Sequence, residues 1–360
     1  MDEIEKNRKE IDEIDNKLLE LLDLRGEKVK KITEIKNKNK KPIFDPSREK
    51  KIIDKLAGKK LKYLKREDIE LIMSTIFKIY RGLFKPLNIA FLGPEGTFTH
   101  QAALKKFGNK CNFISKKAIE DVFKEVEKGR ADYGVVPIEN SMEGVVSHTV
   151  DMFVESNVKI TSEILLEIHH YLLSKEKSVK KIKKIFSHPQ AFAQCRRWIL
   201  TNLGDVEMIE VESTTSAVKK TKKIKNSGAI ASEIASCIYK LPILAERIED
   251  FTENITRFLV IGKEYSKMTG KDKTSIIFSI KDKVGALYNS LYPFKEKGIN
   301  LTRLESRPSK KKAWDYIFFV DFIGHKDEKE VKEALMELEK NCVFLKILGS
   351  YPMEGGKNDE

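Results

Sequence analysis

The chain has 360 residues, of which 41% are hydrophobic and 34% charged, and its 68 Lys and Arg against 55 Asp and Glu give a formal net charge of +13. This length allows two or three domains with cores of their own. No apolar run approaches the roughly 18 residues of a membrane span, and the N-terminus is unlike an export signal, so we expect a cytoplasmic protein with no membrane partner.

The positive charge does not indicate a nucleic acid partner, because the lysines alternate with glutamates in helical patterns and no nucleic-acid-binding motif occurs. A positive field would instead attract small polyanionic substrates. The cysteines are scattered without a CxxC pair, which is typical of reduced core thiols and argues against a disulfide framework or a metal site. They are Cys111, Cys195, Cys237 and Cys342.

Residues 1 to about 37 form one continuous helical pattern with two rows of apolar residues at seven-residue spacing. A single helix cannot bury such a stripe, so its length predicts packing against a partner chain. Two shorter helices, near 47–57 and 65–84, complete an all-α unit over residues 1–86. The apolar rows are Ile4, Ile11, Leu18 and Ile32, and Ile14, Leu21 and Ile35.

Cations interrupt the apolar face of the first helix. Arg25 stands on the seven-residue register, where a bundle needs an apolar side chain, and a buried cation there requires an anion. Lys36 projects from nearly the same face, whereas Arg8 points about 100° away and could serve a site built across a dimer. The alternative is that all three are ordinary surface cations.

Residues 4–84 resemble the all-helical chorismate mutases, in which an intertwined dimer binds the substrate. The resemblance implies that Arg8 from the partner chain, Arg25 and Arg48 bind carboxylates, that Lys36 faces the ether oxygen, and that Glu49 holds the substrate hydroxyl. Rearrangement of chorismate to prephenate needs no metal or cofactor, only a compact dianion and a cation near the ether oxygen. The matching residues are Arg8, Arg25, Lys36, Asp45, Arg48 and Glu49.

One position departs from the mutase pattern. The family usually has Gln or Glu near the end of the third helix as a second donor to the ether oxygen, and Phe84 stands at that place here. A phenyl ring cannot donate a hydrogen bond. We therefore expect an impaired mutase, unless Ser74 or Tyr80 on the same helix supplies the donor.

From residue 87 to about 264 short β-rich runs alternate with helices, which predicts an α/β unit of two lobes around a cleft. Several strings in this region resemble prephenate dehydratases, and the resemblance implies a fold like that of periplasmic binding proteins and the conversion of prephenate to phenylpyruvate. The strings are GPEGTFTHQAA (93–103), YGVVPIENSMEG (133–144), SHPQAFAQCRRW (187–198), ESTTSA (212–217), AIASEIA (229–235) and NITRF (254–258).

Three of these strings place hydroxyl and amide groups at expected helix starts, where they could hold an anion or act as helix caps. By the resemblance Thr256 donates to the leaving hydroxyl and Arg257 anchors a carboxylate, although a strand threonine needs no function. His188 is either a general acid or a cap, and His169 and His170 lie on one expected strand. The expected substrate-binding residues are Thr97, Asn140, Ser141, Ser187, Gln190, Ser213 and Thr214.

Residues 272–352 follow a βαββαβ order, which predicts an α+β ferredoxin-like unit. The unit resembles the ACT domains that bind amino acids, and the strings GAL and ESRP are those linked with phenylalanine in dehydratases. Gly285 would let a carboxylate approach the helix start; the alternative is a unit that only dimerises. The expected effector-binding residues are Gly285, Ala286, Leu287, Glu305, Ser306, Arg307 and Pro308.

Together these resemblances imply a bifunctional enzyme of phenylalanine biosynthesis with chorismate and prephenate as substrates, L-phenylalanine as effector, and a homodimeric or larger assembly. Two alternatives share the fold. One is a monofunctional dehydratase with an impaired mutase domain, and the other is a non-enzymatic amino-acid-binding sensor.

Overall fold

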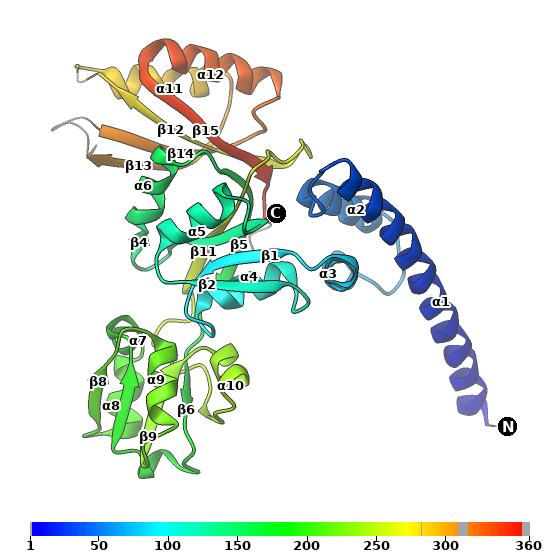
Figure 1. Ribbon diagram of the computed structural model, residues 1–360, viewed down its shortest axis with the longest axis vertical. Helices are drawn as coiled ribbons and strands as arrows, with labels where there is room; N and C mark the ends of the chain where they lie inside the picture. Colours follow the sequence, from blue (N-terminus) through cyan, green and yellow to red (C-terminus); the bar gives the residue numbers. More distant parts are fainter. Residues whose placement is uncertain (1, 282, 309–315, 355–360) are drawn as a thin grey trace.

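The computed structural model describes residues 2–281, 283–308 and 316–354 and divides the chain into a helical unit, a two-lobed α/β unit and a C-terminal α+β unit (Figure 1). This multidomain order is the one expected from the sequence. None of the helices formed by the described residues combines the length and apolar character that a membrane span needs.

The N-terminal unit is entirely helical. Asp45 caps the second helix by accepting a hydrogen bond from the Arg48 amide, and Pro46 occupies the first helical position, where it needs no partner for an amide. The first helix projects away from the rest of the molecule (Figure 1). The helices are α1 (Glu3–Lys38), α2 (Pro46–Ala57) and α3 (Arg66–Phe84).

The first lobe of the α/β unit contains a six-stranded mixed sheet in the order β2-β1-β3-β11-β5, with β4 paired to β3. Strands β1, β2 and β3 are parallel, whereas β11 runs antiparallel to β3 and β5. The strands are β1 (Asn88–Leu92), β2 (Asn112–Lys116), β3 (Tyr133–Asn140), β4 (Gly144–Val145), β5 (Lys159–Glu167) and β11 (Ile255–Gly262), and the helices are α4 (Phe98–Phe107), α5 (Ile119–Glu127) and α6 (Ser147–Glu155).

The second lobe contains a five-stranded sheet in the order β10-β6-β9-β7-β8 and lies at the far end of the molecule from the C-terminal unit (Figure 1). Its strands are β6 (Tyr171–Leu173), β7 (Lys184–Ser187), β8 (Glu207–Glu210), β9 (Ser227–Ala231) and β10 (Ile243–Ala245). Its helices are the 3-10 turn η1 (Val179–Lys181), α7 (Pro189–Gln194), α8 (Arg196–Leu203), α9 (Thr214–Thr221) and α10 (Glu233–Tyr239).

The chain crosses between the lobes at residues 168–170 and returns through the segment before β11. The run KITSEILLEIHHYLL, residues 159–173, predicts one strand from the sequence, but this prediction is wrong because the crossing separates β5 from β6. His169 and His170 lie in this crossing segment. Each ring has its own partner, since His169 Nδ1 lies 2.7 Å from Glu249 Oε1 and His170 Nε2 lies 2.7 Å from Gln194 Oε1.

The C-terminal unit has the expected βαββαβ order, and its sheet runs β13-β14-β12-β15. One face of the sheet packs under the two helices, and the other face shares a core with the first lobe that includes Ile277, Phe319 and Leu348. The run AWDYIFFVDFIG, residues 313–324, predicts the third strand, and its first three residues lie outside the described residues. The elements are β12 (Asp272–Ile280), α11 (Ala286–Glu296), β13 (Leu301–Pro308), β14 (Tyr316–Ile323), α12 (Lys329–Asn341) and β15 (Cys342–Pro352).

The four cysteines are free. Cys195 is buried, as expected of a core thiol, and burial raises the pKa of its thiol. Cys237 is exposed, so the expectation of a core position is wrong for this residue, which lies near the end of the surface helix α10.

Candidate active sites

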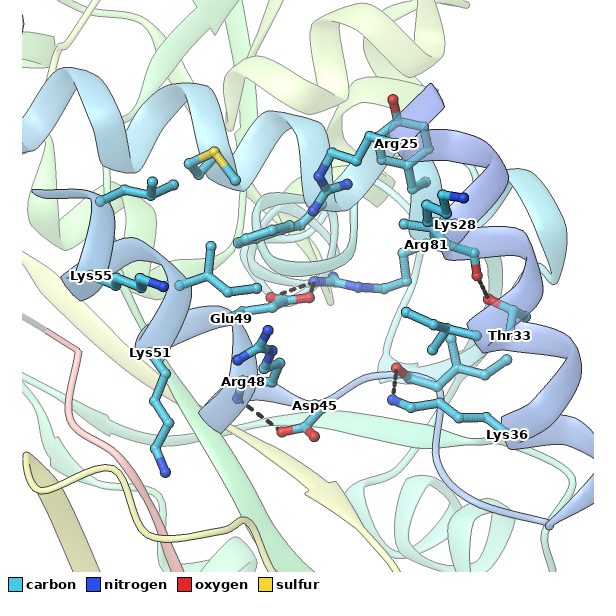
Figure 2. A pocket seen from close by; sticks show the side chains of 18 of the residues that line it. Arg25, Lys28, Thr33, Lys36, Asp45, Arg48, Glu49, Lys51, Lys55 and Arg81 are labelled. Carbon is cyan, nitrogen blue, oxygen red and sulfur yellow. Dashed lines mark hydrogen bonds and ion pairs between the residues drawn. The ribbon is translucent and has the colours of Figure 1, made fainter. Parts of the chain in front are cut away.

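A cavity of about 630 Å³ lies between α1, α2 and α3 (Figure 2). It is rich in cations, which Figure 2 shows on all three helices around the carboxylates of Asp45 and Glu49. The structure thus brings together most of the residues expected from the mutase resemblance. Those that line the cavity are Arg25, Lys36, Asp45, Arg48 and Glu49.

The cations of this cavity are incompletely paired. The Arg25 guanidinium lies over the rings of Phe77 and Tyr80, and its Nη1 is buried without a hydrogen-bond partner among the described residues. Lys36 Nζ donates to the Ile43 carbonyl at 3.1 Å, and burial lowers the pKa of Lys36. An anionic ligand would therefore supply charge that the cavity lacks.

Arg8 does not line this cavity. It lies on the exposed N-terminal half of α1, about 25 Å along the helix axis from Arg25. The apolar stripe of the same half is uncovered, since Ile11 and Leu18 are each 54% exposed. Within one chain, Arg8 is therefore too far from Arg25 to contribute to this cavity.

Phe84 does not line the cavity between the helices. It lines a separate hollow with Leu19 and Leu22, because the last turn of α3 extends past the cavity along residues 19–30 of α1. Tyr80 was one of the two residues that could replace the missing donor to the ether oxygen. Its hydroxyl already donates to the Leu22 carbonyl. One turn before Phe84, Arg81 lines the cavity, and nothing in the sequence pattern singled it out.

A second cavity, of about 290 Å³, lies between the lobes of the α/β unit. Hydroxyls at two helix starts reach it because Thr97 caps α4 and Ser213 caps α9. Each lobe contributes, so the cavity is complete only when both lobes are in place. The expected residues that line it are Thr97, Asn140, Gln190, Ser213, Thr214 and Thr256.

Thr256 lies at the end of a chain of hydrogen-bonded side-chain amides. Its Oγ1 accepts a hydrogen bond of 2.8 Å from Asn140 Nδ2, which leaves the hydroxyl hydrogen available for donation. Asn140 also donates to Asn254, whose amide in turn donates to Gln194. Gln194 Oε1 lies 2.7 Å from His170 Nε2, and burial lowers the pKa of His170, which favours its uncharged form.

Asn254, Gln194 and His170 were not expected in the site, although the strings SHPQAFAQ and NITRF contain the two amides. Conversely, Ser187 and Ser141 do not line the cavity. Ser187 is fully buried and donates to the Ile230 carbonyl, whereas the Ser141 hydroxyl donates to the Glu253 carbonyl.

His188 lines the cavity and its side chain accepts from the Gln190 amide, so it caps α7. The sequence left a helix cap and a general acid as alternatives for His188, and the structure shows the helix cap. The same imidazole can still contact a ligand in the cavity.

Arg257 faces away from the cavity, which contradicts its expected role as a substrate anchor. Neighbouring residues of a strand point to opposite faces of the sheet, so Thr256 and Arg257 cannot face the same site. Its Nε donates to Glu163 at 2.8 Å, Nη1 donates to Asp321, and Nη2 donates to the Tyr351 hydroxyl at 2.9 Å. Arg257 therefore joins β11 to the C-terminal unit.

A third cavity, of about 270 Å³, lies at the start of α11 and is lined by Gly285, Ala286 and Leu287 as expected. Gly285 has a φ of +76°, in the left-handed region that favours glycine. Tyr288 also lines this cavity.

The ESRP string is divided between the two faces of the C-terminal sheet. Ser306 and Pro308 are exposed and pair with Phe318 and Tyr316, which line the third cavity. Glu305 and Arg307 lie on the opposite face of the strand, where Arg307 Nη1 lies 3.0 Å from Asp151 of α6. The expectation that all four residues contact an effector is therefore wrong for Arg307, whose guanidinium is held by the first lobe.

Comparison with known proteins matches all three units. Residues 7–83 match the family model of chorismate mutase type II, residues 89–266 that of prephenate dehydratase, and residues 274–340 that of the ACT domain. A bifunctional chorismate mutase/prephenate dehydratase of Aquifex aeolicus is 50% identical over 98% of both chains, and one of Pseudomonas aeruginosa is 42% identical over the same shares.

Among solved structures, prephenate dehydratase from Arthrobacter aurescens in complex with L-Phe is 32% identical, with a TM-score of 0.69 over 74% of this chain and 90% of the other. These matches do not favour an impaired mutase or a non-enzymatic sensor. The cavity between the helices and the cavity between the lobes fall within separately matched regions. The chain belongs to the family of bifunctional chorismate mutase/prephenate dehydratases that carry an ACT domain.

Proposed function

We propose that the cavity between the helices rearranges chorismate to prephenate. Arg25 and Arg48 bind the carboxylates together with Arg8 from a second copy of the chain, Lys36 stabilises the charge that develops on the ether oxygen, and Glu49 holds the hydroxyl. The observation that carries this proposal is the incompletely paired group of cations around one cavity. Asp45 keeps the site together by capping α2.

The cavity between the lobes converts prephenate to phenylpyruvate, water and carbon dioxide. Thr256 donates a hydrogen bond to the leaving hydroxyl, because Asn140 already occupies an acceptor site of its oxygen. Thr97, Gln190, Ser213 and Thr214 orient the substrate. Aromatisation of the ring supplies the driving force. The imidazole of His170 holds Gln194, the last of the linked amides behind Thr256.

L-Phenylalanine binds at the start of α11 between paired C-terminal units and inhibits the dehydratase. Its carboxylate faces the backbone amides that follow Gly285, and Ser306 and Pro308 border the same face of the sheet. A relative in complex with L-Phe supports this ligand. Inhibition requires that phenylalanine bind one arrangement of the units more tightly than another.

The assembly is a cytoplasmic homodimer or larger homo-oligomer. The exposed apolar stripe of α1 supports this assembly, because a second α1 would cover it and bring Arg8 to the mutase cavity.

Separate incubations of the purified chain with chorismate and with prephenate, followed by phenylpyruvate absorbance, test the two activities. Formation of phenylpyruvate from both substrates, suppressed by millimolar phenylalanine, is the expected result. A chain that converts prephenate but not chorismate would contradict the mutase assignment, and a rate that ignores phenylalanine would contradict the effector site.

A further inference from the structure

Arg81 occupies an unusual position at the border of the mutase cavity. Its side chain is only 5% exposed, and its Nη2 donates to both carboxylate oxygens of Glu49, at 2.5 and 2.7 Å (Figure 2). Its Nη1 donates to the Lys106 carbonyl at 2.8 Å. One guanidinium thus joins a carboxylate of the mutase cavity to the first lobe of the dehydratase.

The first lobe is well suited to hold this cation. Lys106 lies in the last turn of α4, where carbonyls have no partner within the helix and carry the negative end of the helix dipole. The guanidinium also lies over the rings of Phe44 and Phe107, at 4.4 and 5.6 Å from their centroids. These contacts fix Arg81 from three sides.

The loop between α1 and α2 is fastened to the same place. The ring of Phe44 packs edge-on against Phe107 and Tyr133 of the first lobe, and the Tyr133 hydroxyl donates to the Phe44 carbonyl at 3.3 Å. Phe44 directly precedes the cap residue Asp45 of α2. The start of α2, which carries Arg48 and Glu49 into the cavity, therefore rests on the dehydratase.

A glutamate side chain has several rotatable bonds, and its carboxylate can hold a substrate hydroxyl only from one position. The guanidinium holds both oxygens of Glu49 through Nη2 while Nη1 stays on the Lys106 carbonyl. A single ammonium nitrogen does not offer these two donor positions in a fixed relation. We propose that Arg81 is a positioning residue of the mutase, which holds Glu49 for the substrate and is itself held by the dehydratase through the Lys106 carbonyl. The proposal rests on the function assigned above to Glu49.

The test is a double-mutant cycle in the full-length chain with Arg81→Met, Glu49→Gln and the double variant. Arg81→Met should lower the mutase kcat about 10- to 100-fold and change the KM for chorismate less than about threefold, because a misplaced catalytic group affects the reacting state most. If Arg81 acts through Glu49, the double variant should be no slower than Glu49→Gln alone.

Two further variants separate positioning from folding. Arg81→Lys keeps the charge but cannot contact Glu49 and the Lys106 carbonyl through two separate, fixed nitrogens, so its kcat should lie between those of wild type and Arg81→Met. Arg66→Met, which removes an exposed cation of the same helix that pairs with Asp54 and Glu70, should leave the mutase kcat within about twofold. Dehydratase turnover and the thermal midpoint, recorded for every variant, report on folding.

Each outcome decides the proposal. A fully additive cycle, or an Arg81→Lys variant as fast as wild type in a chain with normal dehydratase turnover, would overturn it while leaving the mutase assignment intact. A Glu49→Gln variant with a normal mutase rate would overturn the assigned function of Glu49 and the role of Arg81 together.

Discussion

Replacing Arg257 by Met should destabilise the chain rather than weaken prephenate binding. The Arg257 side chain is 10% exposed, and its guanidinium contacts the carboxylates of Glu163 and Asp321, whose side chains are 0% exposed. Glu163 would keep Lys273 at 3.0 Å, whereas Asp321 would lose the cation that contacts it. Removing one partner of a buried ion pair costs about 3 to 5 kcal/mol, because the remaining charge is left buried and unpaired.

This loss corresponds to a decrease of roughly 6 to 20 °C in the thermal midpoint of a unit of this size. Scanning calorimetry of the full-length chain measures it, and prephenate kinetics below the transition should show a KM within about threefold of wild type. The matched control is Arg130→Met, because Arg130 pairs with Glu125 but its side chain is 54% exposed, so its loss should leave the thermal midpoint nearly unchanged. A tenfold rise in KM at an unchanged midpoint would refute the placement of Arg257.

The pH dependence of stability gives a second readout. Burial alone would raise the pKa of Asp321, but Arg257 and the Ser275 hydroxyl outweigh it and hold this pKa below its usual value. The stability from Asp321 is therefore present above about pH 4 and is lost as the pH falls through the lowered pKa. In Arg257→Met burial dominates, so the acid-induced decrease of the midpoint should begin at a higher pH than in wild type.

Three other changes should have separable effects. Thr256→Ala should lower dehydratase kcat about a hundredfold with little change in KM, whereas Thr256→Ser should keep much of the rate; an alanine variant with near-normal turnover would exclude Thr256 as the donor. Lys36→Ala should nearly abolish the mutase. Burial lowers the pKa of Lys36 from 10.5, so the wild-type mutase rate should fall at a pH below the one at which an ordinary lysine titrates. A mutase rate that does not change up to pH 10.5 would contradict the role of this cation. Leu18→Lys should reduce the assembly to monomers in sedimentation and remove mutase activity, since the stripe of α1 would no longer pair; an intact, active oligomer would show that another surface makes the assembly.

Local patterns predicted the local parts of both sites. The seven-residue period of α1 placed Arg25, and its eleven-residue spacing to Lys36 placed both cations on nearly the same face. Cap chemistry placed Thr97 and Ser213 at helix starts. Each of these inferences needs only the residues of one helix and its first turn.

The residues that sequence reasoning misplaced or missed depend on contacts between units. Arg81 is a basic residue in the last turn of a helix, an ordinary pattern whose burial here comes from Phe44 and from α4. Strand alternation already separates Thr256 from Arg257, but no pattern within β11 shows that a further domain covers the second face. The residues of ESRP also alternate between the two faces of β13, and the string by itself does not show that the first lobe contacts one of these faces.

The position of β11 limits how this region of the chain can vary. The strand is paired on both edges, to β3 and β5, and Thr256 lies on the face of the dehydratase cavity whereas Arg257 lies on the face of the C-terminal unit. Insertion or deletion of one residue before Thr256 would exchange these faces, because the side-chain period of a strand is two. Such a change would place a cation in the cavity and leave Asp321 unpaired in the same step. A length change in β11 therefore damages both faces at once, whereas a single substitution affects one of them.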